Sequence, residues 1–193
     1  DATVFLDGVD LNRVPLGRLR DAIGFVPQDS FLFSETVREN LAFGFDDLPP
    51  AEAVARAAEA SALGPDLAAL PQGLDTLVGE RGVTLSGGQR QRVAIGRALL
   101  KDPRILVLDD ALSAVDTETE ATILERLRRE ARGRTVFVVA QRLSAVEFAD
   151  RIVVLDAGRI VEEGTHAQLM ALEGWYARTW RRQRLEGELE SLR

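Results

Sequence analysis

The chain has 193 residues, 46% of them hydrophobic, and a formal net charge of −7 at pH 7. This length and composition allow one domain with a substantial core, and the negative charge argues against nucleic acid as the main partner. The absence of Cys excludes disulfides and zinc–thiolate sites. No apolar run approaches the roughly 18 to 20 residues of a membrane span, and the first residues, DATVFLDG, do not follow the pattern of a signal peptide.

Short apolar runs alternate along the chain with helical patterns, which predicts an α/β fold with a mostly parallel sheet. The block from about residue 34 to residue 100 lacks strong strands, so we expect it to form an inserted helical subdomain. We expect strands at 3–7, 22–27, 104–109, 134–140 and 151–156. We expect helices at 50–62, 88–101, 117–132 and 143–149.

Further predictions concern one helix end and the aromatic residues near the C-terminus. Thr117 is of a residue type that caps helix N-termini, so we expect it to cap the helix at 117–132. Trp175, Tyr176 and Trp180 stand at helical spacing, and we expect them to pack the C-terminal tail rather than to bind a ligand. The only His, His166, is expected to be a structural surface residue and not a catalytic one.

A buried strand that ends in two acids predicts a site at its carboxyl end. The apolar run from Ile105 to Leu108 is followed directly by Asp109 and Asp110. In open α/β sheets, ligands bind at the carboxyl ends of the strands. The two carboxylates therefore indicate a functional site at this edge.

The stretch LSGGQRQRVAIGRALL predicts a phosphate-binding helix start. Gly87 and Gly88 stand where a loop becomes a helix, and the absence of Cβ atoms lets their backbone N–H groups approach a ligand. The helix N-terminus adds partial positive charge, and Ser86 adds a hydroxyl. These residues are suited to binding an anion such as a phosphate.

Together, LSGGQRQR and ILVLDDALSAVD resemble the nucleotide-binding domain of an ABC transporter of the exporter type. The other elements of the family follow in order along almost the whole chain. FVPQD, with Gln28, is similar to the Q-loop, and VGERG resembles the segment ahead of the signature LSGGQ. ILVLD resembles the Walker B strand, SAVD (113–116) the D-loop, VVAQR (138–142) the H-loop region and GRIVEEGTHAQLM (158–170) the family's ending.

The resemblance implies a P-loop NTPase (RecA-like) fold, in which a parallel sheet core carries an inserted α-helical subdomain. It implies four parts, which are the core with the Q-loop, the helical subdomain ending in the signature helix, the core with Walker B, D-loop and H-loop position, and a C-terminal helical extension. These parts cover 1–33, 34–100, 101–165 and 166–193.

The family's phosphate-binding motif G-x-x-x-x-G-K-[ST] does not occur in this sequence, whose only Lys, Lys101, follows the signature helix. We therefore expect the chain to be the C-terminal part of a longer polypeptide and to lack the N-terminal P-loop portion. In exporters of this type, a membrane domain of six helices precedes that portion. The resemblance places such a domain upstream and this chain at the cytoplasmic face of the membrane.

The resemblance also implies ATP and Mg²⁺ as cofactors. Asp109 is expected to hold Mg²⁺, together with the side-chain oxygen of Gln28, because Mg²⁺ prefers hard oxygen ligands. The nucleotide is expected to contact Gln28 and the signature residues Ser86, Gly87, Gly88 and Gln89.

Two residues depart from the family pattern at the step of hydrolysis, for which Asp110 and Gln141 are the expected catalytic residues. Asp110 stands where the family usually has a Glu that polarises the attacking water, and its carboxylate is displaced by roughly 1 Å. Gln141 stands where a His usually contacts the γ-phosphate, and an amide can neither carry a positive charge nor transfer a proton. We expect this site to bind ATP but to hydrolyse it slowly.

Nucleotide-binding domains of this family stack head to tail, so the full LSGGQ of this chain would complete a partner's site. A partner with an intact Glu and His would then form a heterodimer with one consensus and one degenerate site. Asp116 and Ser113 are expected at the dimer interface. The leading interpretation is thus an ATPase coupled to export, and the alternatives are a regulatory ATP-binding subunit with little turnover and a soluble ABC ATPase that is not a transporter.

Overall fold

The computed structural model describes residues 4–79, 82–130 and 133–190. The chain divides into two units, Asp1–Val139 and Ala140–Arg193, which we call the first and the second unit and describe separately. Within the predicted VGERG segment, Glu80 and Arg81 lie outside the described residues.

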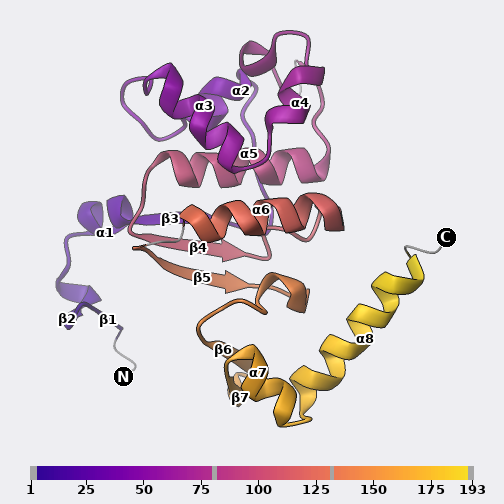
Figure 1. The fold of residues 1–193 in the computed structure, drawn as a ribbon. Coiled ribbons are helices and arrows are strands. Elements are labelled where there is room, and N and C mark those ends of the chain that lie inside the picture. The colour runs from indigo at the N-terminus through magenta and orange to yellow at the C-terminus, as the bar shows by residue number, and fades with distance from the viewer. Residues whose placement is uncertain (1–3, 80–81, 131–132, 191–193) are drawn as a thin grey trace. The chain divides into compact units, whose positions relative to one another are not determined.

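The first unit is built on a parallel sheet of three strands in the order β3-β4-β5 (Figure 1). Val26 lies beside Leu108, and Asp109 beside Val139, so the carboxyl ends of neighbouring strands share one edge. This sheet confirms the predicted fold class of a parallel α/β core. The bounds are Ile23–Val26 for β3, Ile105–Asp109 for β4 and Thr135–Val139 for β5.

The remaining strands form two antiparallel hairpins outside the parallel sheet. In each hairpin, two consecutive residues with positive φ make the turn, Asp7 and Gly8 in the first and Ala157 and Gly158 in the second. Such a turn joins adjacent antiparallel strands, which explains why the runs predicted at 3–7 and 151–156 do not join the parallel sheet. The strands are β1 (Phe5–Leu6), β2 (Val9–Asp10), β6 (Ile152–Asp156) and β7 (Arg159–Gly164).

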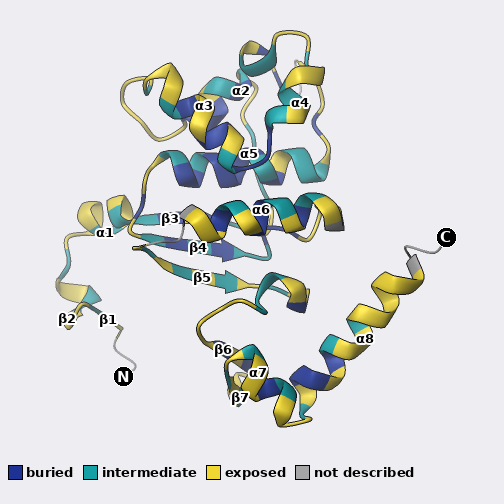
Figure 2. Cartoon of the chain, in the orientation of Figure 1, coloured by how far each residue is buried: buried dark blue, intermediate teal, exposed yellow. Residues whose placement is uncertain are grey.

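Helix α5 (Gly87–Leu100) is central to the first unit, since it packs on β3 on one side and on α2 and α3 on the other (Figure 1). It is buried along much of its length (Figure 2), and Val93 joins a core cluster with Leu41, Val54 and Leu63. The other helices of this unit are α1 (Leu16–Ala22), α2 (Val37–Leu41), α3 (Ala51–Ala60), α4 (Gly64–Ala69) and α6 (Thr117–Glu130), with short 3₁₀ helices η1 (Leu11–Arg13) and η2 (Gly73–Asp75).

Two local predictions are wrong. The helix expected at 143–149 is a 3₁₀ helix, η3 (Leu143–Ala145), followed by turns, because most of its backbone bonds join residues three apart. The N-cap of α6 is Asp116 and not Thr117, since Asp116 Oδ1 accepts a hydrogen bond from the Thr119 N–H at 2.9 Å. The helix therefore begins at Thr117, one residue earlier than a cap at Thr117 would require.

The second unit packs α7 (His166–Ala171) and α8 (Trp175–Glu190) with the β6–β7 hairpin. Tyr176 is fully buried in its core and Trp180 is partly buried there, as predicted, but Trp175 is 49% exposed. His166 Nδ1 and Tyr176 Oη form a hydrogen bond of 2.9 Å, which agrees with a structural role for the histidine. None of the helices in the described ranges combines the length and the apolar character of a membrane span.

Tyr176 makes the second unit less stable at alkaline pH. Burial raises the pKa of Tyr176 to about 12, and the charge of Glu147 adds to this effect. Because the folded state favours the neutral phenol, the contribution of Tyr176 to stability is complete below the ordinary pKa near 10. This contribution is lost as the pH rises through about 12. We expect tryptophan fluorescence to report unfolding over this range. Tyr176→Phe should remove the pH dependence there, and an unchanged profile would assign it to another group.

Candidate functional site

The predicted magnesium ligands lie at the shared carboxyl edge of the parallel sheet. Asp109 is the last residue of β4 and is half-buried, and Gln28 follows the neighbouring strand β3 by two residues and is exposed. This edge is where ligands of open α/β sheets bind. The structure therefore brings a carboxylate and an amide oxygen to one end of adjacent strands, as a Mg²⁺ site requires.

Asp110 follows Asp109 in a left-handed backbone conformation, with φ of +47°. Residues other than Gly adopt this region rarely, and it costs roughly 1–2 kcal/mol. Hydrogen bonds hold it, since the Asp110 N–H donates to Val139 O at 2.8 Å and the Asp110 carbonyl accepts from the Ser113 N–H at 3.2 Å. The direction of the second acid is thus set by a strained and well-anchored turn.

Ser86 and Gln89 form a reciprocal cap at the start of α5. Ser86 Oγ accepts from the Gln89 N–H at 3.2 Å, and Gln89 Oε1 accepts from the Ser86 N–H at 2.8 Å. The two residues therefore have a structural role in addition to the predicted contact with a nucleotide. Gly87 and Gly88 begin the helix as predicted.

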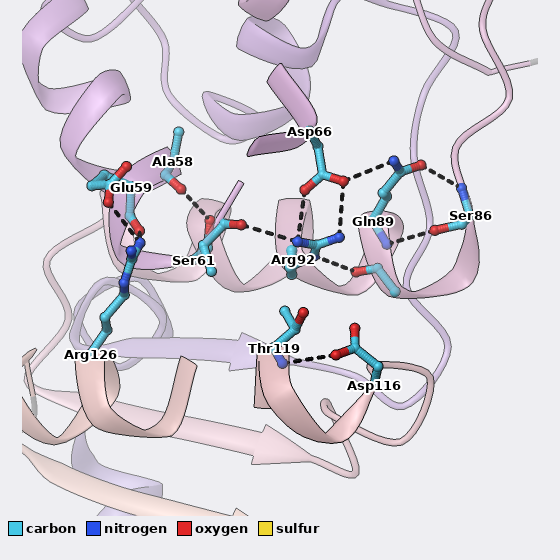
Figure 3. A network of polar contacts seen from close by, with 12 residues as sticks. Ala58, Glu59, Ser61, Asp66, Ser86, Gln89, Arg92, Asp116, Thr119 and Arg126 are labelled. Atoms are coloured by element: carbon cyan, nitrogen blue, oxygen red, sulfur yellow. Dashed lines mark hydrogen bonds and ion pairs between the residues drawn. The ribbon is translucent and has the colours of Figure 1, made fainter. Parts of the chain in front are cut away.

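A largely buried ion pair holds the signature helix on α4 (Figure 3). Arg92 Nη1 lies 2.7 Å from Asp66 Oδ2, and the two side chains are only 13% and 14% exposed. Gln89 Nε2 donates to Asp66 Oδ1 at 2.9 Å, so the same carboxylate binds the signature glutamine. No motif of the sequence marks Asp66, whose partners lie more than 20 residues away along the chain.

The two signature glycines also allow the helix to approach the D-loop. A Cβ atom at Gly88 would lie 2.9 Å from the Ala114 carbonyl oxygen, and one at Gly87 would lie 3.3 Å from the Ala114 Cβ. Any larger residue at position 88 must displace this backbone. The glycines are therefore required for packing as well as for the predicted approach of a ligand.

A pocket of about 250 Å³ in the first unit brings three of the predicted motifs together. Gln28 comes from the Q-loop, Gly87 from the signature and Ser113 from the D-loop. Gln91, which the motifs did not predict as a site residue, also faces this pocket. The full lining is Gln28, Asp29, Ser30, Gly87, Arg90, Gln91, Ser113 and Ala114.

Asp116 and Gln141 are both exposed. The hydrogen bond from the Thr119 N–H lowers the pKa of Asp116, so its carboxylate is charged at neutral pH. Gln141 belongs to the second unit, where its carbonyl oxygen accepts from Gln183 Nε2 at 2.8 Å. Both residues therefore lie on a surface, where a partner or a nucleotide can reach them.

Comparison with known proteins agrees with the motifs. A family profile described as "ABC transporter" matches residues 2–113. The chain is 50% identical over 185 residues to the probable multidrug resistance ABC transporter ATP-binding/permease protein YheI of Bacillus subtilis strain 168, covering 96% of this chain and 32% of that protein. It is 48% identical over 186 residues to an ATM1-type heavy metal exporter of Novosphingobium aromaticivorans, covering 96% and 30%.

A solved structure shares the fold as well. The structure of a bacterial Atm1-family ABC exporter with ATP bound has a TM-score of 0.89 and 47% sequence identity, and the match covers 95% of this chain and 32% of that one. The chain spans about a third of the length of the curated relatives it matches. Since the family profile covers more than half of it, the chain belongs to the ABC transporter family, with the fold of the nucleotide-binding domain of an Atm1- or multidrug-type exporter.

Proposed function

We propose that this chain is part of the ATP-hydrolysing motor of a membrane exporter and works at the cytoplasmic face of the membrane. The observation that carries the proposal is the pocket in which Gln28, Gly87 and Ser113 meet. Three segments that are far apart in the sequence converge there. A nucleotide bound at Gln28 would therefore act on the helical subdomain through direct contacts. The relatives include proteins named as heavy metal exporters and lipid A-core flippases, so we propose export without assigning a cargo.

The residues present fit Mg²⁺ and ATP. Asp109 and Gln28 supply oxygen ligands at one sheet edge, and Mg²⁺ would neutralise charge on the phosphates when bound. Gln28 also contacts the nucleotide in this proposal, and Asp110 orients the attacking water. Gln141 donates a hydrogen bond to the terminal phosphate.

The signature residues serve the second site of a head-to-tail pair. Ser86, Gly87, Gly88 and Gln89 form the capped start of a 14-residue helix, which favours an anion held by a partner chain. Asp116 and Ser113 are both exposed, which suits the proposed interface. We propose a heterodimer, because two copies of this chain would place Asp110 and Gln141 in both sites.

The exposed face of the sheet supports a preceding segment with the P-loop. Phe25, Val107 and Phe137 lie in one row across β3, β4 and β5. Phe25 and Phe137 are 55% and 56% exposed, although they stand in a parallel sheet, which is usually covered on both faces. In this proposal, a helix of a preceding portion with the P-loop covers this row.

The division of the chain into the four parts 1–33, 34–100, 101–165 and 166–193 remains a prediction.

An aromatic surface beside the Q-loop supports a contact with a membrane domain. Phe31 meets Phe33 edge to face with ring centres 5.1 Å apart, and Phe33 stacks on Phe43 at 4.3 Å. Arg97 lies over the Phe43 ring. Phe31 and Phe43 are mostly exposed. An apolar surface that follows Gln28 so closely can pass the state of the nucleotide site to a membrane domain of the same polypeptide.

The proposed asymmetry between the two sites can be tested by measuring ATP turnover in the full-length transporter with its partner. We expect Ser86→Ala to lower ATP turnover at least about tenfold, because it removes a hydrogen-bond donor from the consensus site. Asp110→Asn should change turnover less than about twofold. Ser86→Thr, which keeps the hydroxyl and the helix cap, is the matched control.

Other outcomes of the same assay identify the alternatives. Equal losses in Ser86→Ala and Asp110→Asn would contradict the degenerate site and indicate two equivalent sites. ATP binding without measurable turnover in the unchanged protein would favour a regulatory ATP-binding subunit, which the departures at Asp110 and Gln141 also permit.

A further inference from the structure

A chain of hydrogen bonds joins the signature helix to the backbone of Asp110. Gln91 on α5 is 5% exposed, and its Nε2 donates to Ser113 Oγ at 3.3 Å. Ser113 Oγ in turn donates to the Asp110 carbonyl at 2.8 Å. A hydroxyl has one hydrogen, so the two bonds require Ser113 to accept from Gln91 and to donate to Asp110.

Gln91 uses both ends of its amide. Its Oε1 accepts from the Ala114 N–H at 3.0 Å, while its Nε2 binds Ser113. A carboxylate or an apolar side chain could not make both bonds, because the first lacks the donor and the second lacks both groups. The site therefore selects for an amide at this position.

Contacts on both sides of Gln91 make the signature helix and the D-loop one packed block. Gly88 approaches the Ala114 carbonyl so closely that no Cβ fits between them. Asp110 needs this support, because its φ of +47° is one that residues other than Gly rarely adopt. The turn itself supplies the bonds from Ser113, and Gln91 connects that turn to α5 across 22 residues of sequence.

We infer that Gln91 is a positioning residue, which holds Ser113 and through it the backbone that carries Asp110. In this way the signature, which serves one ATP site, is tied to the acid of the other site within the same chain. The consequence for catalysis rests on the proposed function of Asp110. The linkage itself can be tested without it.

Hydrogen exchange tests the linkage in the full-length transporter. We expect Gln91→Met to increase exchange of the amides from 109 to 116, because the Ala114 N–H loses its acceptor. Ser113→Ala should have a smaller effect in the same direction, and Ser113→Thr should retain the protection. Gln72→Met changes an exposed glutamine of the helical subdomain and is the matched control. Unchanged exchange in Gln91→Met and Ser113→Ala overturns the linkage.

Turnover at this chain's own site, measured in the Asp110→Glu background with the partner's site disabled, tests the positioning role. In that background we expect Gln91→Met to lower kcat about tenfold with KM for ATP within about twofold, because a displaced acid slows chemistry and not binding. Adding Ser113→Ala should cause little further loss, since both changes break one chain of bonds. Faster exchange with unchanged kcat in the Asp110→Glu background overturns the role in positioning. If Asp110→Glu does not raise turnover, the proposal of a degenerate site is wrong. The hydrogen-exchange result still decides whether Gln91 is linked to the backbone of Asp110.

Discussion

Replacing Asp110 by Glu and Gln141 by His together should raise ATP hydrolysis at this chain's own site by about a hundredfold. The longer side chain of Glu moves the carboxylate by roughly 1 Å towards the water, and a misplacement of that size can change a rate by this factor. The imidazole restores a group that can carry positive charge beside the terminal phosphate. Site-resolved turnover in the full-length transporter, with the partner's site disabled, measures the gain.

The structure offers a matched control for this gain of function. Asp150→Glu adds the same methylene to an exposed aspartate of the second unit, and we expect it to leave turnover unchanged. Asp110→Glu alone should give part of the gain. No increase in the double replacement would mean that Asp110 and Gln141 do not limit hydrolysis.

Arg92→Ala should cause the largest loss of stability in the first unit. It leaves the Asp66 carboxylate buried without its ion pair and removes the bond from Arg92 Nη1 to Ala62 O. Breaking one partner of a buried ion pair costs about 3–5 kcal/mol. We expect the free energy of opening of α5, measured by hydrogen exchange of its most protected amides, to fall by that amount.

Two further variants separate the buried pair from ordinary surface charge. Arg129→Ala breaks an ion pair with Glu125 whose side chains are both 68% exposed, and it should cost less than about 1 kcal/mol. Replacing Arg92 by Met together with Asp66 by Leu should recover most of the stability, since no buried charge remains. Equal losses in Arg92→Ala and Arg129→Ala would contradict the importance of burial.

Much of the parallel core could be predicted, because its signals are local. The run that ends at Asp109 is a buried strand in the structure, and Ser86 with Gln89 makes the cap that begins α5. The helix expected at 143–149 is a short 3₁₀ helix followed by turns, a difference that the sequence pattern did not indicate. The Leu143 N–H, which has no partner within a helix that begins there, donates to Gln183 Oε1 of α8 at 2.9 Å.

The sequence alone determined the family, the order of the motifs and the position of two acids at the end of a central strand, because each of these is written in consecutive residues. Only the tertiary structure decided which side chains meet. Asp66 reaches Arg92 across 26 residues, and Gln91 reaches Ser113 across 22. Neither pair belongs to a common periodic pattern. Their partners depend on how α4, α5 and the D-loop pack, since hydrogen bonds and buried ion pairs form only where that packing removes water.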